Sequence, residues 1–362
     1  IPTVNISVAF LSNRLQFSGD IYQRKTTDMF TVGMSLPAVF GTDVPKGNYA
    51  DLTTKGFELS VSWRDQFQLA SKPFNYEVRF TLADYQSTID KYNNPEKKLG
   101  DDYYYEGMKV GEIWGYETEG FFTSQADIDS HAKQPYFYAG ATAGQWLPGD
   151  IKFKDLNGDG VIDYGNNTVD NPGDQKIIGN SEPRFIYGIN LSGDWNNFFV
   201  SAFFQGVGKQ DWWPGSEASY FWGMYNRPYN DMPKSHLGNI WTEENPNTYF
   251  PRLRGYSSEE PYAELNLKQT RYLQNIAYIR MKNIQLGYTL PKSFISKLRM
   301  QNAKVYVSGE NLWSWSPFYK YSKDLDVEAV RGSDRDLTEG TSGNGYSYPI
   351  LKSVSFGLSV TF

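Results

Sequence analysis

The last fifteen residues of the chain, YPILKSVSFGLSVTF, constrain its fold most strongly. Across residues 354–362 every even position is apolar, and every odd position is Gly, Ser or Thr. A period of two is typical of a β-strand with one apolar face. Because the other face carries only small or hydroxylated side chains, the strand matches a transmembrane β-barrel, which meets lipid on one side and water on the other. An edge strand of a soluble β-sandwich is the alternative.

The same alternation recurs in eight earlier segments, at residues 3–10, 15–25, 55–63, 74–82, 185–195, 198–208, 277–290 and 303–313. The connections between these segments are alternately short and long. Outer-membrane barrels have this rhythm, with short periplasmic turns and long extracellular loops, whereas such long loops are unusual in compact domains. We therefore expect an all-β, antiparallel transmembrane β-barrel in which residues 91–183 and 209–276 are long extracellular loops.

The phase of the alternation predicts which side chains face lipid. The residues that we expect on the lipid face are Phe57, Leu59, Val61, Phe80, Leu286, Phe356 and Leu358. Nine strands are too few for loops of this size, and single-chain bacterial barrels have even strand numbers. We therefore expect the chain to be part of a longer polypeptide whose preceding residues supply the remaining strands.

The composition agrees with a barrel and excludes other classes. The 362 residues include 27 Tyr, 23 Phe and 10 Trp, which suits the aromatic girdles of a barrel. There is no Cys, as is common for a protein that crosses an oxidising periplasm without disulfides. A net charge of −6 argues against nucleic acid as a partner.

Residues 155–163 read DLNGDGVID, which is the pattern of an EF-hand calcium loop. The twelfth loop position is Asn166 and not Glu, so a bidentate carboxylate would have to come from elsewhere, such as Asp170 or Asp174. We expect weak, structural binding of Ca²⁺ or a similar hard cation, and a solvated acidic turn is the alternative. The expected ligands are Asp155, Asn157, Asp159, the Val161 carbonyl and Asp163.

The second long segment is rich in aromatic residues. Exposed rings in a loop are unfavourable unless they pack or bind something, and flat rings stack on the faces of sugars. A glycan platform and packing within the loops or against a partner both remain open. The candidate substrate-binding residues are Trp212, Trp213, Tyr220, Trp222, Tyr225 and Tyr229.

The charges of the loops bear on the cargo. Residues 91–183 hold 16 acidic and 8 basic residues, a net charge of −8, so they should repel anionic glycans. This favours a neutral oligosaccharide, with basic peptides as the alternative cargo. Only two histidines, His131 and His236, and no catalytic motif are present, so we do not expect an enzyme or an organic cofactor.

Five stretches in fixed order carry a resemblance to a known family. They are PGDIKFKDLNGDGVID, IIGNSEPRFIYGINLSGDWNNFFVSAFFQGVG, YIRMKNIQLGYTLPKS, VYVSGENLWSW and YPILKSVSFGLSVTF. Together they resemble the C-terminal region of the SusC/RagA family of TonB-linked outer-membrane transporters from Bacteroidetes-type bacteria. The earlier stretches NRLQFSGDIYQRKTTDM and DLTTKGFELSVSW also fit this family.

The resemblance implies that residues 1–362 are the C-terminal part of a single barrel domain, which has 22 strands in the family. The plug and the TonB-interacting segment would lie outside this chain. The family imports oligosaccharides, or peptides in some members, across the outer membrane with energy delivered through TonB. Its partner is a SusD-like surface lipoprotein that closes over the barrel, and dimers of such pairs are possible. A soluble β-sandwich module that binds glycans, and a surface hydrolase, are the rival classes.

Overall fold

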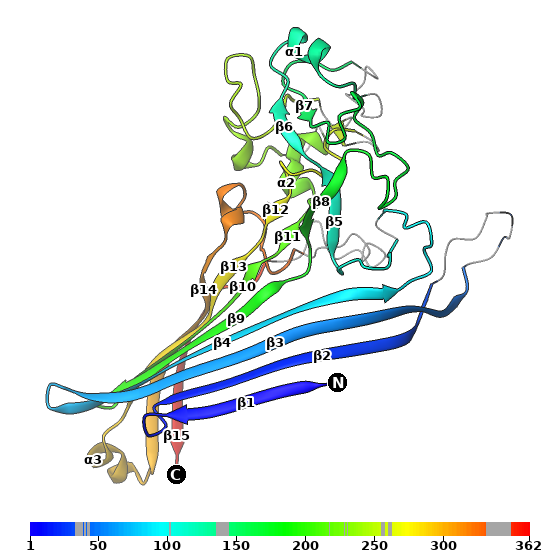
Figure 1. Ribbon diagram of the computed structural model, residues 1–362. Helices are drawn as coiled ribbons and strands as arrows, with labels where there is room; N and C mark the ends of the chain where they lie inside the picture. Colours follow the sequence, from blue (N-terminus) through cyan, green and yellow to red (C-terminus); the bar gives the residue numbers. More distant parts are fainter. Residues whose placement is uncertain are drawn as a thin grey trace.

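All nine expected strands are present and form one antiparallel sheet in the computed structural model (Figure 1). The structure describes residues 1–32, 39, 41, 44–100, 103–134, 145–216, 218–227, 229, 231–254, 258–259, 263–330 and 349–362. The order of the strands in the sheet is β1-β2-β3-β4-β9-β10-β13-β14-β15. Their bounds are Thr3–Phe10, Leu15–Val32, Lys46–Leu69, Lys72–Lys91, Arg184–Trp195, Phe198–Lys209, Tyr278–Thr289, Asn302–Trp315 and Ser353–Thr361.

The register of the sheet confirms that the apolar positions share one face. Val61 lies opposite Phe80, and the same row continues through Ile189 to Phe204. Val200 lies on β10 four residues before Phe204 and therefore points to the same side of the sheet. It lies opposite Leu286, and this row continues across the sheet through Val307 to Phe356. Because side chains of one row point to the same side, the seven residues expected to face lipid lie on a single apolar face.

The opposite face is polar and partly ion-paired. Arg64 lies directly opposite Glu77, with their charged groups 3.8 Å apart. Ser192 and Ser201 of the next two strands continue this row, so this face suits a water-filled lumen. Its polarity completes the two-sided pattern from which the barrel was predicted.

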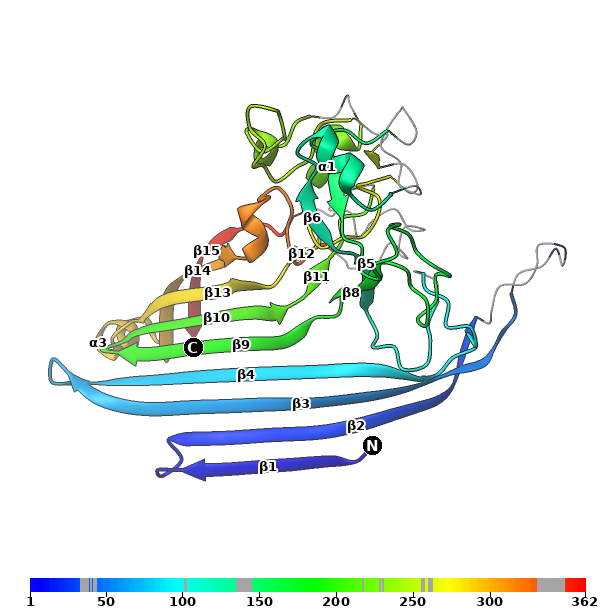
Figure 2. The ribbon, with the colours of Figure 1, turned by 45° about the horizontal axis from the view of Figure 1, so that its top comes forward.

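The short connections gather at one end of the sheet and the long ones at the other (Figures 1 and 2). Asn196 and Asn197 form the predicted turn between β9 and β10, with φ angles of 47° and 71° that Asn tolerates better than most residues. Helix α3 (Lys292–Ile295) and η5 (Ser296–Leu298) lie in the connection between β13 and β14, at the short end. The chain ends at this same end, beside β14.

Three strands are longer than the alternation predicts. β2, β3 and β4 continue beyond the membrane-like segment, and β3 pairs with β4 from Asp51 to Leu69. The added residues lack an apolar face, so no period of two marks them. They remain in strands because their backbones still pair with the neighbouring strand.

The two long segments are folded, although the sequence suggested irregular loops. We call the described residues between 92 and 183, between 210 and 277 and between 316 and 330 the loop cap. Its strands are β5 (Glu112–Tyr116), β6 (Thr118–Phe121), β7 (Ile151–Phe153), β8 (Gln175–Asn180), β11 (Asp211–Trp212) and β12 (Gln274–Asn275). Its helical turns are α1 (Gln125–Ser130), α2 (Ser219–Trp222), η2 (Gly223–Tyr225), η3 (Lys234–His236) and η6 (Pro317–Lys320).

The close-packed apolar core lies in the loop cap and not between the faces of the sheet. Its largest fully buried side chains are Trp212, Trp222, Tyr225, Tyr272, Phe122, Phe153, Phe221, Phe250 and Phe318. The side chains of the sheet cannot supply such a core, because one face is polar and the other is exposed, with Phe356 at 86%. The cap therefore has its own source of stability, which fixes the geometry of any site built in it.

No helix among the described residues is both long and apolar enough to cross a membrane.

Candidate functional site

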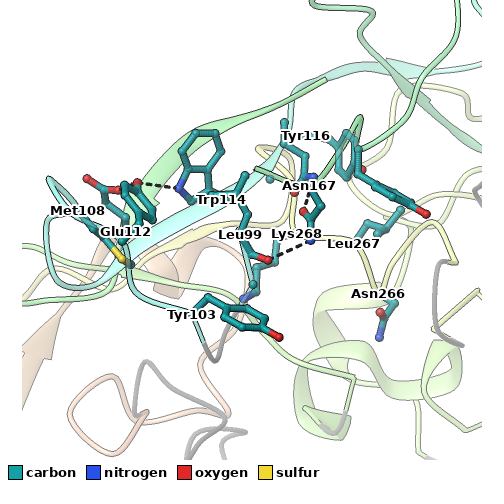
Figure 3. Close-up of a pocket in the computed structure, with 15 residues that line it drawn as sticks. Leu99, Tyr103, Met108, Glu112, Trp114, Tyr116, Asn167, Asn266, Leu267 and Lys268 are labelled. Carbon is teal, nitrogen blue, oxygen red and sulfur yellow. Dashed lines mark hydrogen bonds between the residues drawn. The ribbon is translucent and has the colours of Figure 1, made fainter. Parts of the chain in front are cut away.

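The loop cap contains a cleft of about 590 Å³ between its first and second long segments (Figure 3). The first segment reaches the second at Tyr116, whose backbone N–H donates to the Lys268 carbonyl at 2.8 Å. A Cβ at Gly115 would lie 2.4 Å from the same carbonyl oxygen, so only glycine allows this approach. The cleft is lined by Leu99, Gly100, Tyr103, Tyr105, Met108, Glu112, Trp114, Gly115, Tyr116, Tyr164, Asn167, Gln175, Asn266, Leu267 and Lys268.

On one wall of the cleft, a chain of hydrogen bonds fixes the position of the Trp114 indole ring. The Trp114 Nε1–H donates to the Tyr105 hydroxyl at 3.2 Å, and that hydroxyl donates to Glu112 Oε2. The other oxygen of Glu112 accepts the Lys109 N–H at 3.0 Å. Burial and the neighbouring carboxylate raise the pKa of Tyr105 well above its usual range, so the hydroxyl stays protonated and remains a donor.

The opposite wall consists of amides. Asn167 and Leu99 bind each other twice: the Leu99 N–H donates to the Asn167 carbonyl at 2.8 Å, and the Asn167 side chain donates to the Leu99 carbonyl at 3.0 Å. Gln175, at the start of β8, donates to the Asn167 side-chain oxygen at 3.3 Å. These contacts orient polar groups beside the aromatic wall, as Figure 3 shows.

Flat rings beside fixed amides suit the recognition of a ligand that carries both apolar faces and hydroxyl or amide groups. Sequence reasoning missed this cleft because it searched for aromatic residues in the second long segment. The signal was present in the first segment, where YYYEGMKVGEIWGY holds four of the five aromatic residues that line the cleft. Its aromatic rings and amides give the cleft the chemistry of a binding site.

The exposure assumed for the six aromatic candidates is wrong for four of them. Trp212, Trp213, Trp222 and Tyr225 are buried in the core of the cap. The Trp222 indole donates to the carbonyls of Pro214 and Gly215, and the Tyr225 hydroxyl donates to that of Pro251. A sugar cannot stack on these rings, because protein already covers both faces. Tyr220 and Tyr229 are 52% and 78% exposed, and their binding role stays a prediction.

The predicted cation loop is ordered by its own backbone. Asp155 accepts the N–H groups of Gly158 and Gly160 at 2.6 and 2.9 Å, and Asp159 accepts that of Val161 at 2.8 Å. The side chain of Asn157 donates to Asp159 at 3.0 Å, and Asp163 accepts the N–H of Gly165. Within the described residues, no three His, Cys, Asp or Glu side chains form a group that could hold a metal. Cation binding by this loop stays a prediction.

Asp174, one of the two carboxylates suggested as an additional cation ligand, accepts backbone hydrogen bonds from both ends of the loop. Its Oδ1 accepts the Leu156 N–H at 2.7 Å, and its Oδ2 accepts the Asp163 N–H at 2.8 Å. The carboxylate is buried and clamps the start of the acidic loop to its end. Desolvation raises the pKa of Asp174, and hydrogen bonds from the backbone N–H groups of Asp163, Leu156 and Asn157 oppose that shift.

A buried charged cluster joins the two long segments of the cap. Asp150 is fully buried and receives two hydrogen bonds from Arg254, one of them at 2.7 Å. Glu264 is also fully buried, and its Oε2 accepts the Ile151 N–H at 2.9 Å. Burial, together with the nearby Asp150 carboxylate, raises the pKa of Glu264 to about 8.

The two histidines have structural surroundings. His236 is buried, and its Nε2 lies 2.9 Å from the Phe221 carbonyl oxygen. His131 makes the corresponding contact with the Phe153 carbonyl oxygen at 2.8 Å. Each imidazole therefore holds a turn of the cap in place.

The fold and the two-sided sheet define a class of protein: part of an antiparallel transmembrane β-barrel with a folded cap over its long-loop end. No family model matches the chain. The chain is 27% identical to TonB-dependent receptor P3 of Formosa agariphila over 99% of its own length and 33% of that protein. It is 25% identical to TonB-dependent receptor P26 of the same organism over 99% of its length and 34% of that protein.

Solved structures agree at the level of the fold. The RagAB peptide transporter matches with a TM-score of 0.69 and 19% identity, over 99% of this chain and 34% of that one. The closed-closed state of the RagAB peptide importer matches with a TM-score of 0.69, 18% identity, and coverage of 99% and 35%. The resemblance to the SusC/RagA family of TonB-linked transporters is thus confirmed. The relatives are receptors and transporters and not enzymes, as expected, and this chain spans about a third of the length of the curated relatives that it matches.

Proposed function

We propose that this chain takes part in TonB-dependent import of oligosaccharides across the bacterial outer membrane. The observation that carries the proposal is the cleft of rings and amides in the cap, which stands over the long-loop end of a barrel sheet. A ligand held there would be positioned for passage along the polar face of the sheet. The role of these residues is capture, because the cleft offers no group that would break a bond.

A SusD-like surface lipoprotein is the partner that we propose for the cap. The surface of the loop cap exposes apolar side chains outside the first cleft. Among them are Tyr220, Tyr229 and Leu237, and Leu237 is 66% exposed. Exposed apolar side chains that are grouped in one segment favour contact with another protein surface. TonB would act through a part of the transporter outside residues 1–362. We also propose that pairs of transporter and lipoprotein form dimers.

The proposal is tested by titrating oligosaccharides into the full transporter, purified from the outer membrane with its lipoprotein. The Trp114→Ala variant should bind at least about tenfold more weakly, because a stacked ring contributes on the order of 1–3 kcal/mol. Trp114→Phe keeps a ring and should recover much of the affinity. Phe294→Ala is the control, because Phe294 is 57% exposed at the opposite end of the sheet. Undiminished binding by Trp114→Ala would refute the role of the cleft.

Import of oligopeptides is the second candidate. It is favoured by the similarity in fold to structures described as peptide importers, and amides such as Asn167 and Gln175 would also suit a peptide backbone. A peptide library titrated against the same preparation separates the two functions. If only peptides bind, and if Trp114→Ala weakens that binding, the cargo is a peptide and not an oligosaccharide. The first cleft would then remain the proposed binding site.

A further inference from the structure

A second cleft of about 490 Å³ lies in the loop cap, and no residue lines both it and the first cleft. It brings together the turn around η3, the stretch from Thr248 to Phe250, Arg271, and the end of η6. Its lining residues are Ser235, Asn239, Thr248, Tyr249, Phe250, Arg271, Lys320 and Tyr321. These residues come from four stretches of the chain between positions 235 and 321, so the cleft exists only in the folded cap.

Arg271 is held rigidly at this cleft. Its Nε–H donates to the Tyr249 carbonyl at 2.9 Å, and its Nη2 donates to the Thr248 carbonyl at 2.6 Å. The guanidinium lies over the Phe121 ring, 4.1 Å from the centroid. Within the described part of the chain, nothing accepts a hydrogen bond from Nη1. The orientation of the guanidinium is therefore fixed, and its Nη1 N–H groups can still donate hydrogen bonds. Such a group is well suited to bind an anion.

The cleft is positively charged in a chain that is negatively charged overall. Lys320 is the second cation, with its Nζ 5.3 Å from the centroid of the Tyr321 ring. No Asp or Glu is among the lining residues, and neither cation forms an ion pair within the described residues. Two cations in one concave site raise the local concentration of anions and favour an anionic ligand.

The uncharged residues that line the cleft indicate the kind of molecule to which the anionic group is attached. Tyr321 is half-buried and stacks on Tyr249, with 4.2 Å between ring centroids and 20° between planes. Ser235 and Asn239 add neutral polar groups at the rim. Rings beside hydroxyl and amide groups suit a sugar, and the two cations suit a carboxylate attached to it.

We infer that this cleft is a subsite for a sugar unit that bears a carboxylate, as a uronic acid does. The inference rests on the proposed import of oligosaccharides and names their chemical class. It differs from the neutral cargo expected from the acidic residues of segment 91–183. The charged residues that line the first cleft are Glu112 and Lys268, whereas the second cleft presents only Arg271 and Lys320 as charged groups.

The test uses the full transporter with its lipoprotein and three probes. These are a neutral trisaccharide, the trisaccharide of the same linkage with one unit oxidised to the uronate, and an acidic tripeptide. The unmodified protein should bind the uronate more tightly than the neutral sugar, and only that preference should fade between about 50 and about 500 mM salt. Lys320→Gln should weaken binding of the uronate about tenfold and leave the neutral sugar unchanged, because a charged hydrogen bond is lost.

Two further variants complete the design. Lys323→Gln removes an exposed cation that does not line the cleft, and it should behave like the unmodified protein. Arg271→Lys keeps the charge but loses the fork that binds two carbonyls, so it should weaken uronate binding as well. Because Lys320 is exposed, its substitution should not impair folding.

The outcomes separate this inference from the function on which it rests. Equal affinity for neutral and uronate sugars, or no effect of Lys320→Gln, would overturn the anionic subsite while oligosaccharide binding stands. Binding of the acidic peptide with the same dependence on Lys320, in place of the uronate, would also overturn it. Failure of both sugars to bind would remove the proposed oligosaccharide function itself.

Discussion

Trp222 and Tyr220 lie two residues apart in α2, yet their environments are opposite. Trp222 is fully buried and packs edge-on against Phe221 and Tyr272, whereas Tyr220 is half-exposed. On a short helical turn, neighbouring positions point in different directions, so one ring enters the core while the other meets solvent. Aromatic residues in this segment therefore serve two purposes, and composition alone does not separate them.

Replacement of these two rings should give contrasting stabilities. Trp222→Ala leaves a large cavity and frees two buried carbonyls, so it should lower the free energy of unfolding of the cap by about 3–5 kcal/mol. Tyr220→Ala should change it by less than about 0.5 kcal/mol. Hydrogen exchange of the cap amides in the purified protein measures both. Equal protection in the two variants would contradict the assignment of Trp222 to the core.

The buried carboxyl of Glu264 should make the stability of the cap depend on pH. Its pKa is about 8 in the folded protein, against 4.5 for the ordinary side chain, so the folded state keeps a proton that the unfolded state releases. Stability should therefore fall as pH rises from about 4.5 to about 8, by up to about 1.4 kcal/mol per pH unit. Hydrogen exchange at Ile151, whose N–H donates to Glu264, reports the change.

Glu264→Gln is the matched variant for this titration, because it keeps the shape and removes the charge. Its cap should show a flatter dependence of stability on pH over the same range. Asp129→Asn, at an exposed position in α1, should retain the dependence of the unmodified protein. An identical slope in Glu264→Gln and the unmodified protein would show that another group is responsible.

At the scale of elements, the strands are defined by the two media that they separate. In each of the nine strands, apolar side chains occupy alternate positions. The register of the sheet places these positions side by side, so that they form one apolar face. A shift of one residue would move a polar row into lipid, so the register is strongly specified. The turns contribute less to this specificity, although the Asn196–Asn197 pair fits its positive φ angles.

A charge on the apolar face should be poorly tolerated. Leu286→Arg would place a cation on the side of the sheet that is exposed to lipid, and it should cost about 2–4 kcal/mol near the middle of the membrane. Gln285→Arg, one residue earlier and on the polar face, should be nearly neutral. Urea unfolding in lipid vesicles compares the two variants. Equal destabilisation would show that the two faces have been assigned wrongly.

The loop at residues 155–163 is an element whose carboxylates already accept backbone hydrogen bonds. Each carboxylate oxygen still has a second lone pair, so a calcium ion would compete little with those bonds. We expect Ca²⁺ at ten times its Kd to stabilise the cap by about 1.4 kcal/mol. Melting of the protein with Ca²⁺, with Mg²⁺ and with a chelator measures this. A melting temperature that is unaffected by Ca²⁺ would leave the acidic residues with their backbone role alone.

At the scale of the whole molecule, the cap is held together by contacts between segments that are remote in sequence. Asp150 of the first long segment and Arg254 of the second are 104 positions apart and form a buried ion pair. Arg280 on β13 contacts Asp326 at 2.6 Å and so joins the end of the barrel sheet to the third part of the cap. These pairs determine how the segments stand over the sheet.

Loss of one partner of the buried pair should loosen the cap as a unit. Asp150→Asn removes the carboxylate that accepts two hydrogen bonds from the Arg254 guanidinium, and the Arg254 side chain is only 9% exposed. We expect a loss of about 3–5 kcal/mol in the stability of the cap. Limited proteolysis should then cleave the two long segments faster and spare the sheet. Cleavage confined to the sheet would contradict this division of the molecule.

The sequence alone determined the barrel strands, their faces and the alternation of short and long connections. These follow from local rules, because lipid and water impose a period of two on every strand whatever its neighbours are. Only the tertiary structure decided which aromatic residues are buried and where the clefts lie. Tyr116 meets Lys268, and Arg271 meets Tyr249, through contacts that join distant parts of the chain. No local period records such contacts, since they depend on how folded segments pack against one another.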